Sequence, residues 1–124
     1  MKDTIIQSQI TLIGFKSVKF EYSCLHNKDA KDIKPEFELK LGNLLMEDSP
    51  NRFAKVFYVD LLLPNIQFNE IIKINTEYHA VFQSVNKIDD AFLDSSFAKI
   101  SAPAIGFPYL RAFISSLSVQ AGIA

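Results

Sequence analysis

Hydrophobic and polar residues alternate along most of the first two thirds of the chain. Apolar side chains recur at every second position in the segments 10–22, 33–41 and 71–84, and the segment 53–63 is apolar at almost every position. A period of two is that of a β-strand, whose successive side chains point to opposite faces. The pattern therefore predicts four strands, the third of them apolar on both faces.

The apolar face of the first predicted strand changes partway along it. Leu12 and Phe20 occupy even positions, whereas Ile13 and Phe15 occupy odd positions on either side of Gly14. One extra residue in a strand shifts every following side chain to the other face, and glycine is common at such sites. We therefore expect a bulge or bend near Gly14.

After Asn86 the apolar spacing changes to the three and four residues of a helix. Asp89 and Asp90 favour a helix start there. The last apolar series has the spacing of one helix face: Leu110, Phe113, Ile114 and Leu117. Strands followed by helices predict an α+β fold, with a four-stranded antiparallel sheet and helices packed on one of its faces.

Two prolines and a glycine stand where the last helix should begin. Pro103 suits the first helical position, where its missing N–H costs no hydrogen bond. Pro108 is expected to bend the helix, and Gly106 leaves room for that bend or for close contact with the sheet.

One helix is too small to cover one face of such a sheet. Four strands of about eight residues present on the order of 500 Å² per face, and a helix of about 18 residues covers roughly half of that. Apolar surface is therefore expected to remain open. It can serve as an interface between copies of the chain or as a binding surface for apolar ligands and unfolded segments, and both alternatives stay open.

Composition excludes several classes of function. The chain has 124 residues and a net charge of −1, which gives no basic surface for nucleic acid. No apolar run approaches the ~20 residues of a membrane span. The single cysteine, Cys24, excludes an internal disulfide and fits a reducing compartment, so we expect a cytoplasmic protein without membrane insertion.

Candidate chemistry is sparse. His26 and His79 are isolated and lack the spacing of metal ligands, and His79 is expected to face solvent from the polar side of its strand. Cys24 has no neighbouring pattern for nucleophilic catalysis. We therefore expect no enzyme, no metal site and no cofactor.

The segment 101–122, SAPAIGFPYLRAFISSLSVQAG, resembles the helix segment of the SecB family of protein-export chaperones. In that family a small residue, a proline and a few apolar residues precede Phe-Pro-Tyr-x-Arg. The matching residues are Pro103, Phe107, Pro108, Tyr109, Arg111, Ile114 and Ser115. The segment 14–23, GFKSVKFEYS, looks like the family's first strand, and the order of four strands followed by helices also agrees.

The resemblance implies an ATP-independent holding chaperone. Such a protein binds unfolded polypeptides, either secretory precursors for delivery to SecA or the antitoxin of a toxin–antitoxin system, and assembles as dimers that pair into homotetramers. The resemblance describes residues 1–124 as one SecB-like domain without the family's C-terminal second helix and tail. The alternatives are an oligomerisation module and a carrier of small apolar molecules on the same fold.

The resemblance also implies site residues. Client binding is expected at Phe20, Tyr22, Leu25, Ile33, Phe37 and Leu39. SecA docking is expected at Glu21, although Ser17 and Lys19 stand where the family has acidic or neutral residues. The oligomer interface is expected at Ile74, Tyr78, Leu110, Phe113, Ile114 and Leu117.

Overall fold

The chain forms a four-stranded sheet with one long helix. The computed structural model describes residues 10–120, with side chains through residue 117. The strands are β1 (Ile10–His26), β2 (Glu36–Leu45), β3 (Arg52–Asn65) and β4 (Glu70–Ser84). The helical elements are η1 (Ala30–Asp32), η2 (Ile66–Phe68), α2 (Asp90–Leu93), η3 (Phe97–Ser101) and α3 (Ala102–Gln120). The predicted α+β class is confirmed.

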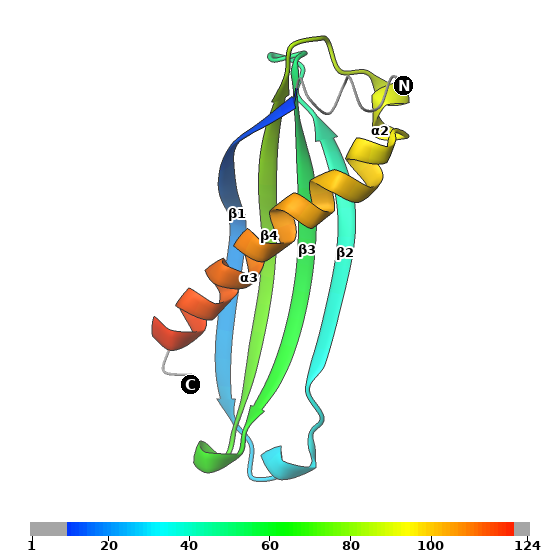
Figure 1. Cartoon of the computed structure of the whole chain (residues 1–124). Helices are drawn as coiled ribbons and strands as arrows, with labels where there is room; N and C mark the ends of the chain where they lie inside the picture. Colours follow the sequence, from blue (N-terminus) through cyan, green and yellow to red (C-terminus); the bar gives the residue numbers. More distant parts are fainter. Residues whose placement is uncertain (1–9, 121–124) are drawn as a thin grey trace.

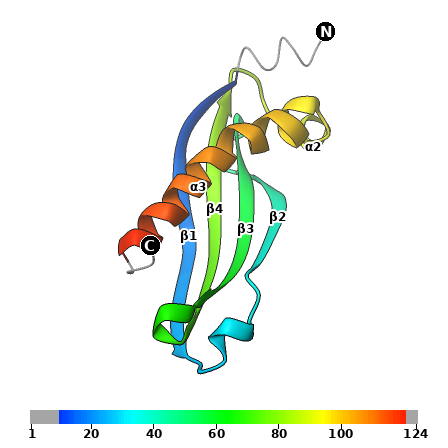
Figure 2. The same ribbon diagram turned by 60° about the horizontal axis from the view of Figure 1, so that its bottom comes forward.

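The strands are antiparallel throughout and lie in the order β1-β4-β3-β2. β1 and β2 are therefore the two edges. Helix α3 crosses one face of the sheet diagonally, from the upper part of β2 and β3 towards β1 (Figure 1). A tilted view shows the same diagonal course and the long sheet behind it (Figure 2). We call the face that carries α3 the helix face.

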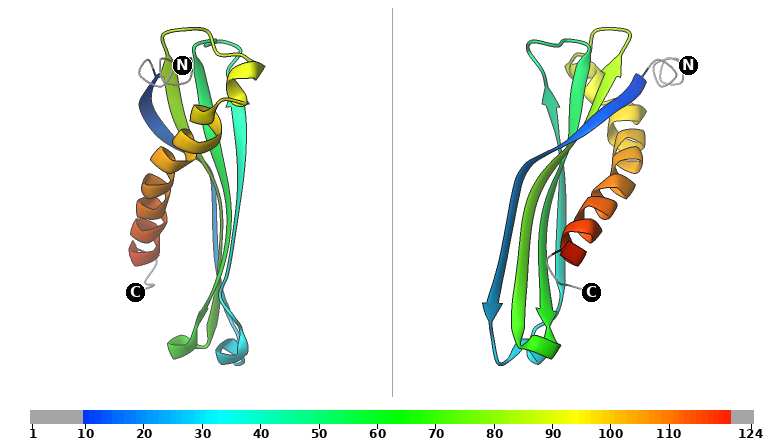
Figure 3. Two further views of the ribbon diagram at one scale, coloured as in Figure 1. Left: turned by 45° about the vertical axis from the view of Figure 1, so that its right-hand side comes forward. Right: turned by 90° about the vertical axis from the view of Figure 1, so that its left-hand side faces the viewer.

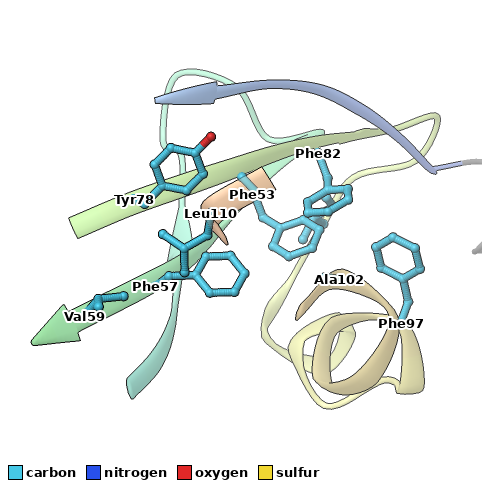
Figure 4. Close-up of a cluster of buried hydrophobic side chains, with 10 residues drawn as sticks. Phe53, Phe57, Val59, Tyr78, Phe82, Phe97, Ala102 and Leu110 are labelled. Atoms are coloured by element: carbon cyan, nitrogen blue, oxygen red, sulfur yellow. The ribbon is translucent and has the colours of Figure 1, made fainter. Parts of the chain in front are cut away.

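The hydrophobic core lies between the upper half of the sheet and the helical segments. Phe53 and Phe57 of β3, Phe82 of β4 and Leu110 of α3 are fully or almost fully buried. Their side chains point toward one another from the two layers (Figure 4). Phe97 stands edge-on to Phe82, with ring centroids 5.4 Å apart, a favourable geometry for aromatic pairs.

Two irregularities in β1 set which side chains reach the core. The pairing with β4 shifts between Leu12 and Gly14 and again between Ser17 and Lys19. The bulge expected near Gly14 is confirmed, and the second shift was not foreseen. Each shift exchanges the faces of the following residues. Phe15 consequently lies on the helix face, where its ring is 4.3 Å from that of Tyr109.

Helix α3 packs closely on the sheet at Gly106, which is one of the two roles expected for this glycine. A Cβ atom there would lie 2.8 Å from Cζ of Phe57 and 3.2 Å from Cβ of Ala80. A side chain fits this space only if the buried Phe57 ring or the helix moves. Only glycine therefore permits the observed separation of the two layers.

The start of the long helix differs from the expectation for Pro103. The chain is already helical from Phe97, because the π turn η3 leads directly into α3, and Pro103 is the second residue of α3 rather than the first of a new helix. The wider π turn directly precedes Pro103, which has no backbone N–H to donate to the turn before it. Pro108 lies inside α3.

Two polar residues of the sheet are more buried than their positions in the pattern indicate. His79 is only 7% exposed, and its Nε2 lies 2.7 Å from Oε2 of Glu77, so the expectation of a solvated histidine is wrong. Lys55 is 5% exposed and donates to Oδ1 of Asn43 at 3.1 Å. Burial lowers the pKa of Lys55, since it disfavours the charged form.

The close packing of Gly106 on Phe57 and Ala80 predicts that adding one methyl group at residue 106 destabilises the protein. Gly106→Ala should lower the free energy of unfolding by about 1–3 kcal/mol, because the new Cβ overlaps the Phe57 ring. Gly14→Ala is the matched control, since a Cβ there meets nothing within 4 Å. Urea unfolding followed by circular dichroism measures both variants. Equal stability of the two variants would contradict the packing described at Gly106.

Candidate functional site

Helix α3 leaves the lower half of the sheet open on the helix face. It crosses β1, and its last turns project past that edge of the sheet, while the lower parts of all four strands continue below it (Figures 1 and 3). Phe113 is the last residue of α3 with an aromatic contact to the sheet. Its ring centroid lies 6.0 Å from that of Phe20 and 5.0 Å from that of Tyr78. Within residues 10–120, no helix lies over the apolar residues of the strands below this level.

A row of apolar residues crosses all four strands in this open region. Tyr22 of β1 is paired with Ile74 of β4, Ile74 with Leu61 of β3, and Leu61 with Phe37 of β2. Paired residues of neighbouring strands point to the same face, and these four follow the alternation of Tyr78 and Phe57 on the helix face. We call Tyr22, Ile74, Leu61 and Phe37 the apolar row.

The exposure of the row increases towards the sheet edges. Ile74 is 2% exposed and Leu61 is half-buried, whereas Tyr22 is 37% and Phe37 is 54% exposed. The two aromatic side chains therefore flank a floor of aliphatic ones. This arrangement presents an apolar surface between two partly exposed aromatic side chains.

The structure places four of the six residues expected to bind clients on one face of the sheet, two on each edge strand. Phe20, Tyr22, Phe37 and Leu39 lie on the helix face, with Leu39 packed partly against the core. Leu25 lies on the opposite face, three residues after Tyr22 in an uninterrupted register. Ile33 caps the η1 turn and is half-buried. The composition of the row itself, and above all Leu61, depends on register between distant strands and was not anticipated.

The residues expected at an oligomer interface divide into two groups. Ile74, Tyr78 and Leu110 are buried within the subunit itself. Phe113, Ile114 and Leu117 of α3 are half-buried. Tyr78 and Leu110 belong to the hydrophobic core, whereas Ile74 is buried in the apolar row. An interface formed by the second group remains a prediction.

A hollow of about 880 Å³ lies at the same level of the sheet. Three consecutive residues of each strand line it: 21–23, 36–38, 60–62 and 73–75. Only the middle residue of each triplet belongs to the apolar row, so the lining comes mainly from the face opposite α3. On that face the lining holds four carboxylates and one ammonium group: Glu21, Glu36, Glu38, Asp60 and Lys73. The hollow is therefore acidic.

Ion pairs reduce this acidity at two places. Lys19 lies 3.0 Å from Glu21, and Lys40 lies 3.3 Å from Glu38. Asn75 donates to a carboxylate oxygen of Asp60. Glu21, the residue expected to dock SecA, is thus at the hollow but shares its charge with a neighbouring lysine.

Cys24 and Tyr22 lie close together on the helix face of β1. The hydrogen bond to Glu70 raises the pKa of the Cys24 thiol, with burial and the charge of Glu70 adding to the effect. Burial raises the pKa of the Tyr22 hydroxyl, followed by the influence of Cys24. Since the thiolate is the nucleophile, this environment makes Cys24 a weak one.

Metal and membrane sites are not found in the described part of the chain. Residues 10–120 contain no group of three or more His, Cys, Asp or Glu side chains that could hold a metal ion. Among the helices described, none is long and apolar enough to cross a membrane.

The thiol environment can be tested by alkylation. Cys24 should react with iodoacetamide more slowly at pH 8 than the same thiol in the urea-unfolded chain, because its raised pKa leaves less thiolate. Glu70→Gln should lower that pKa and speed the reaction of the folded protein. The pH dependence of the alkylation rate gives the pKa directly, and an unchanged profile in Glu70→Gln would contradict the assigned cause.

Comparison with known proteins identifies the fold. No family model and no curated protein sequence matches the chain. Among solved structures, the SecB-like chaperone Rv1957 of Mycobacterium tuberculosis, determined in complex with a ChAD peptide from the HigA1 antitoxin Rv1956, is similar with a TM-score of 0.74. The match covers 100% of this chain and 92% of that chain at 12% sequence identity. The chain therefore has the fold of a SecB-like chaperone.

Proposed function

We propose that this protein is an ATP-independent holding chaperone that binds extended, unfolded polypeptide segments on the apolar row. The observation that carries the proposal is the exposure of Tyr22 and Phe37 at the two ends of a row that α3 does not cover. Full burial of an exposed aromatic side chain contributes about 1.5–3 kcal/mol, and Tyr22 and Phe37, which are 37% and 54% exposed, each supply a part of that when a client covers them. Holding a chain in this way needs apolar surface and no catalytic group.

The row is suited to unfolded rather than folded partners. The row crosses four strands that lie ~4.8 Å apart, so it is roughly 15 Å long. Ile74 and Leu61 form its floor between the two aromatic residues. An extended segment can reach both ends of the row, because residues four apart in it are ~13 Å apart and point to the same side, whereas a folded domain keeps its apolar side chains inside.

The structural neighbour suggests which class of client this protein binds. The solved SecB-like chaperone binds a peptide from an antitoxin. We propose that this protein likewise binds an apolar segment of an antitoxin, with secretory precursors as the other class of client. Both would be met as unfolded chains in the cytoplasm.

The acidic hollow supports a separate docking role on the opposite face. Its carboxylates Glu36 and Asp60 have no ion pair among the described residues, while Glu21 and Glu38 each have a lysine neighbour. A basic segment of a partner such as SecA would find complementary charge there.

The apolar row can be tested with a matched pair of phenylalanines. Phe37→Ser should weaken client binding by about tenfold, because an exposed apolar side chain of the row is lost. Phe68→Ser is the control, since Phe68 is 59% exposed but lies in η2 at the lower end of the sheet. The measurement is suppression of aggregation of a chemically unfolded protein at stoichiometric amounts without ATP.

Two outcomes would contradict the proposal. No suppression by the folded wild-type protein would refute the chaperone function and leave an oligomerisation module as the better description. Equal effects of Phe37→Ser and Phe68→Ser would remove the apolar row from client binding. Circular dichroism of both variants verifies that each remains folded.

The acidic hollow predicts a charge-dependent interaction. A peptide rich in lysine should bind more tightly than the same peptide with glutamate in place of lysine, and the difference should shrink from 50 to 500 mM salt as screening increases. Asp60→Asn should reduce the preference, because it removes one carboxylate of the lining. Fluorescence anisotropy measures the affinities, and a preference that persists at high salt would argue against an electrostatic site.

A carrier of small apolar molecules is the second candidate function. The volume of the hollow, about 880 Å³, is within the usual range of small-molecule sites. Saturation with a long-chain alkylamine, whose ammonium group is opposite in charge to the carboxylates of the hollow, should then occur at one molecule per chain and leave aggregation suppression unchanged. Isothermal titration calorimetry decides this, and absence of heat at millimolar ligand rejects the carrier.

A further inference from the structure

A buried lysine lies on the helix face of β3 without a counter-charge. Lys55 is 5% exposed, and its Nζ donates to Oδ1 of Asn43, a neutral amide, at 3.1 Å. Among the side chains that the structure describes, no carboxylate forms an ion pair with this ammonium group. Lysine is almost never buried unless it is paired, because a buried charge loses its hydration. The ammonium group of Lys55 therefore lacks an anion.

The stem of Lys55 lies under α3. In the sheet, Lys55 is paired with Ala80 of β4 and with Asn43 of β2. Phe57, two residues further along the same face of β3, is fully buried. Gly106 of α3 packs on Phe57 and Ala80, where the helix passes over the upper part of β3 and β2 (Figure 1). The ammonium group is consequently directed towards the edge strand β2, where Asn43 accepts from it.

The edge of the sheet gives access to this pair. Asn43 is exposed and belongs to β2, which in the described part of the chain pairs with β3 alone. The bond to Asn43 uses one of the three protons of the ammonium group, and the amide nitrogen of Asn43 carries two more donors. A carboxylate at this edge can accept from both groups at once, and such charge-assisted hydrogen bonds are the strong ones.

The pair continues a series of apolar residues that begins at the apolar row. Phe37, Leu39, Leu41 and Asn43 follow one another at every second position on the helix face of β2. Phe37 and Leu41 are 54% and 46% exposed. The six residues from Phe37 to Asn43 span roughly 20 Å of strand. Because an extended segment has the same rise, its side chain six positions from the one on Phe37 reaches Asn43 and points to the same side.

We propose that Lys55 and Asn43 bind the carboxylate of an aspartate or glutamate in an extended client segment, six positions from an apolar residue that packs on Phe37. The proposal rests on the proposed function, since the segment is a client of the apolar row. Charge complementarity selects an acidic residue, because a buried ammonium group is stabilised by an anion. Clients with an acidic residue at this spacing are then bound more tightly than those without one.

Peptide pairs test the charge and the spacing. Each peptide carries one phenylalanine and a glutamate six positions before or after it, and its counterpart carries glutamine instead. In one of the two orientations the glutamate peptide should bind about tenfold more tightly, because a hydrogen bond between two charged groups is stronger than one to an amide. Glutamate five positions away should give no gain, since it points to the opposite side. Fluorescence anisotropy measures the affinities, and equal affinity of glutamate and glutamine peptides in both orientations overturns the proposal.

Two lysine variants test which ammonium group is responsible. Lys55→Met keeps an unbranched stem without the charge and should bind the glutamate and glutamine peptides equally. Lys40→Met is the matched control, because Lys40 is exposed on the face opposite α3 and its loss changes the net charge by the same amount. It should keep the preference for glutamate. A preference that survives Lys55→Met, or that Lys40→Met abolishes as well, overturns the proposal.

The pKa of Lys55 provides a measurement on the wild-type protein. Burial lowers this pKa in the free protein, and a bound carboxylate should raise it, because an opposite charge favours the ammonium form. NMR titration of the lysine Cε signals measures the pKa with and without the glutamate peptide. An unchanged pKa overturns the proposal. A pKa that rises with protein concentration alone also overturns it, because a second copy then supplies the carboxylate.

These measurements separate the carboxylate site from the proposed function. If the glutamine peptide binds and aggregation is suppressed, but glutamate gives no gain, only the carboxylate site is contradicted. If aggregation is not suppressed, but the glutamate peptide raises the pKa of Lys55, only the chaperone function is contradicted.

Discussion

The close packing of Gly106 against Phe57 and Ala80 is the contact on which the remainder of the architecture depends. It fixes the separation between α3 and the sheet in the upper half of the molecule, where the aromatic core is buried. From that point α3 runs diagonally towards β1, so it cannot also cover the lower parts of β3 and β2 (Figure 3). The same contact therefore buries one half of the helix face and leaves the other half open.

The open half combines surfaces of different character on the two faces. On the helix face, the apolar row joins residues of all four strands, with aromatic side chains at its ends. On the other face, carboxylates dominate the lining of the hollow. Because alternation sends neighbouring residues to opposite faces, a single stretch such as Glu36-Phe37-Glu38 serves both. An apolar client and a charged partner could thus be bound back to back.

The local pattern of polar and apolar residues was sufficient to predict the strands and helices but not the residues of the apolar row. Alternation and turn residues predicted the four strands to within a few residues, and Gly14 and Asp89 marked a bulge and a helix start correctly. The row required the pairing of Tyr22 with Ile74 and of Leu61 with Phe37, which depends on register between strands far apart in the sequence. The burial of His79 beside the half-buried Glu77 was not predicted, because the alternation of polar and apolar residues shows which face a side chain is on but not how deeply it is buried.

The central claim is that extended polypeptides bind on the apolar row, and methyl NMR tests it most directly. Labelled Leu61 and Ile74 provide probes in the floor of the row, and Ile66 and Ile100, both exposed elsewhere, serve as references. Titration with an unfolded, aromatic-rich peptide should shift the Leu61 and Ile74 methyl signals and leave those of Ile66 and Ile100 in place. Shifts confined to Ile66 or Ile100, with Leu61 and Ile74 unchanged, would contradict the account.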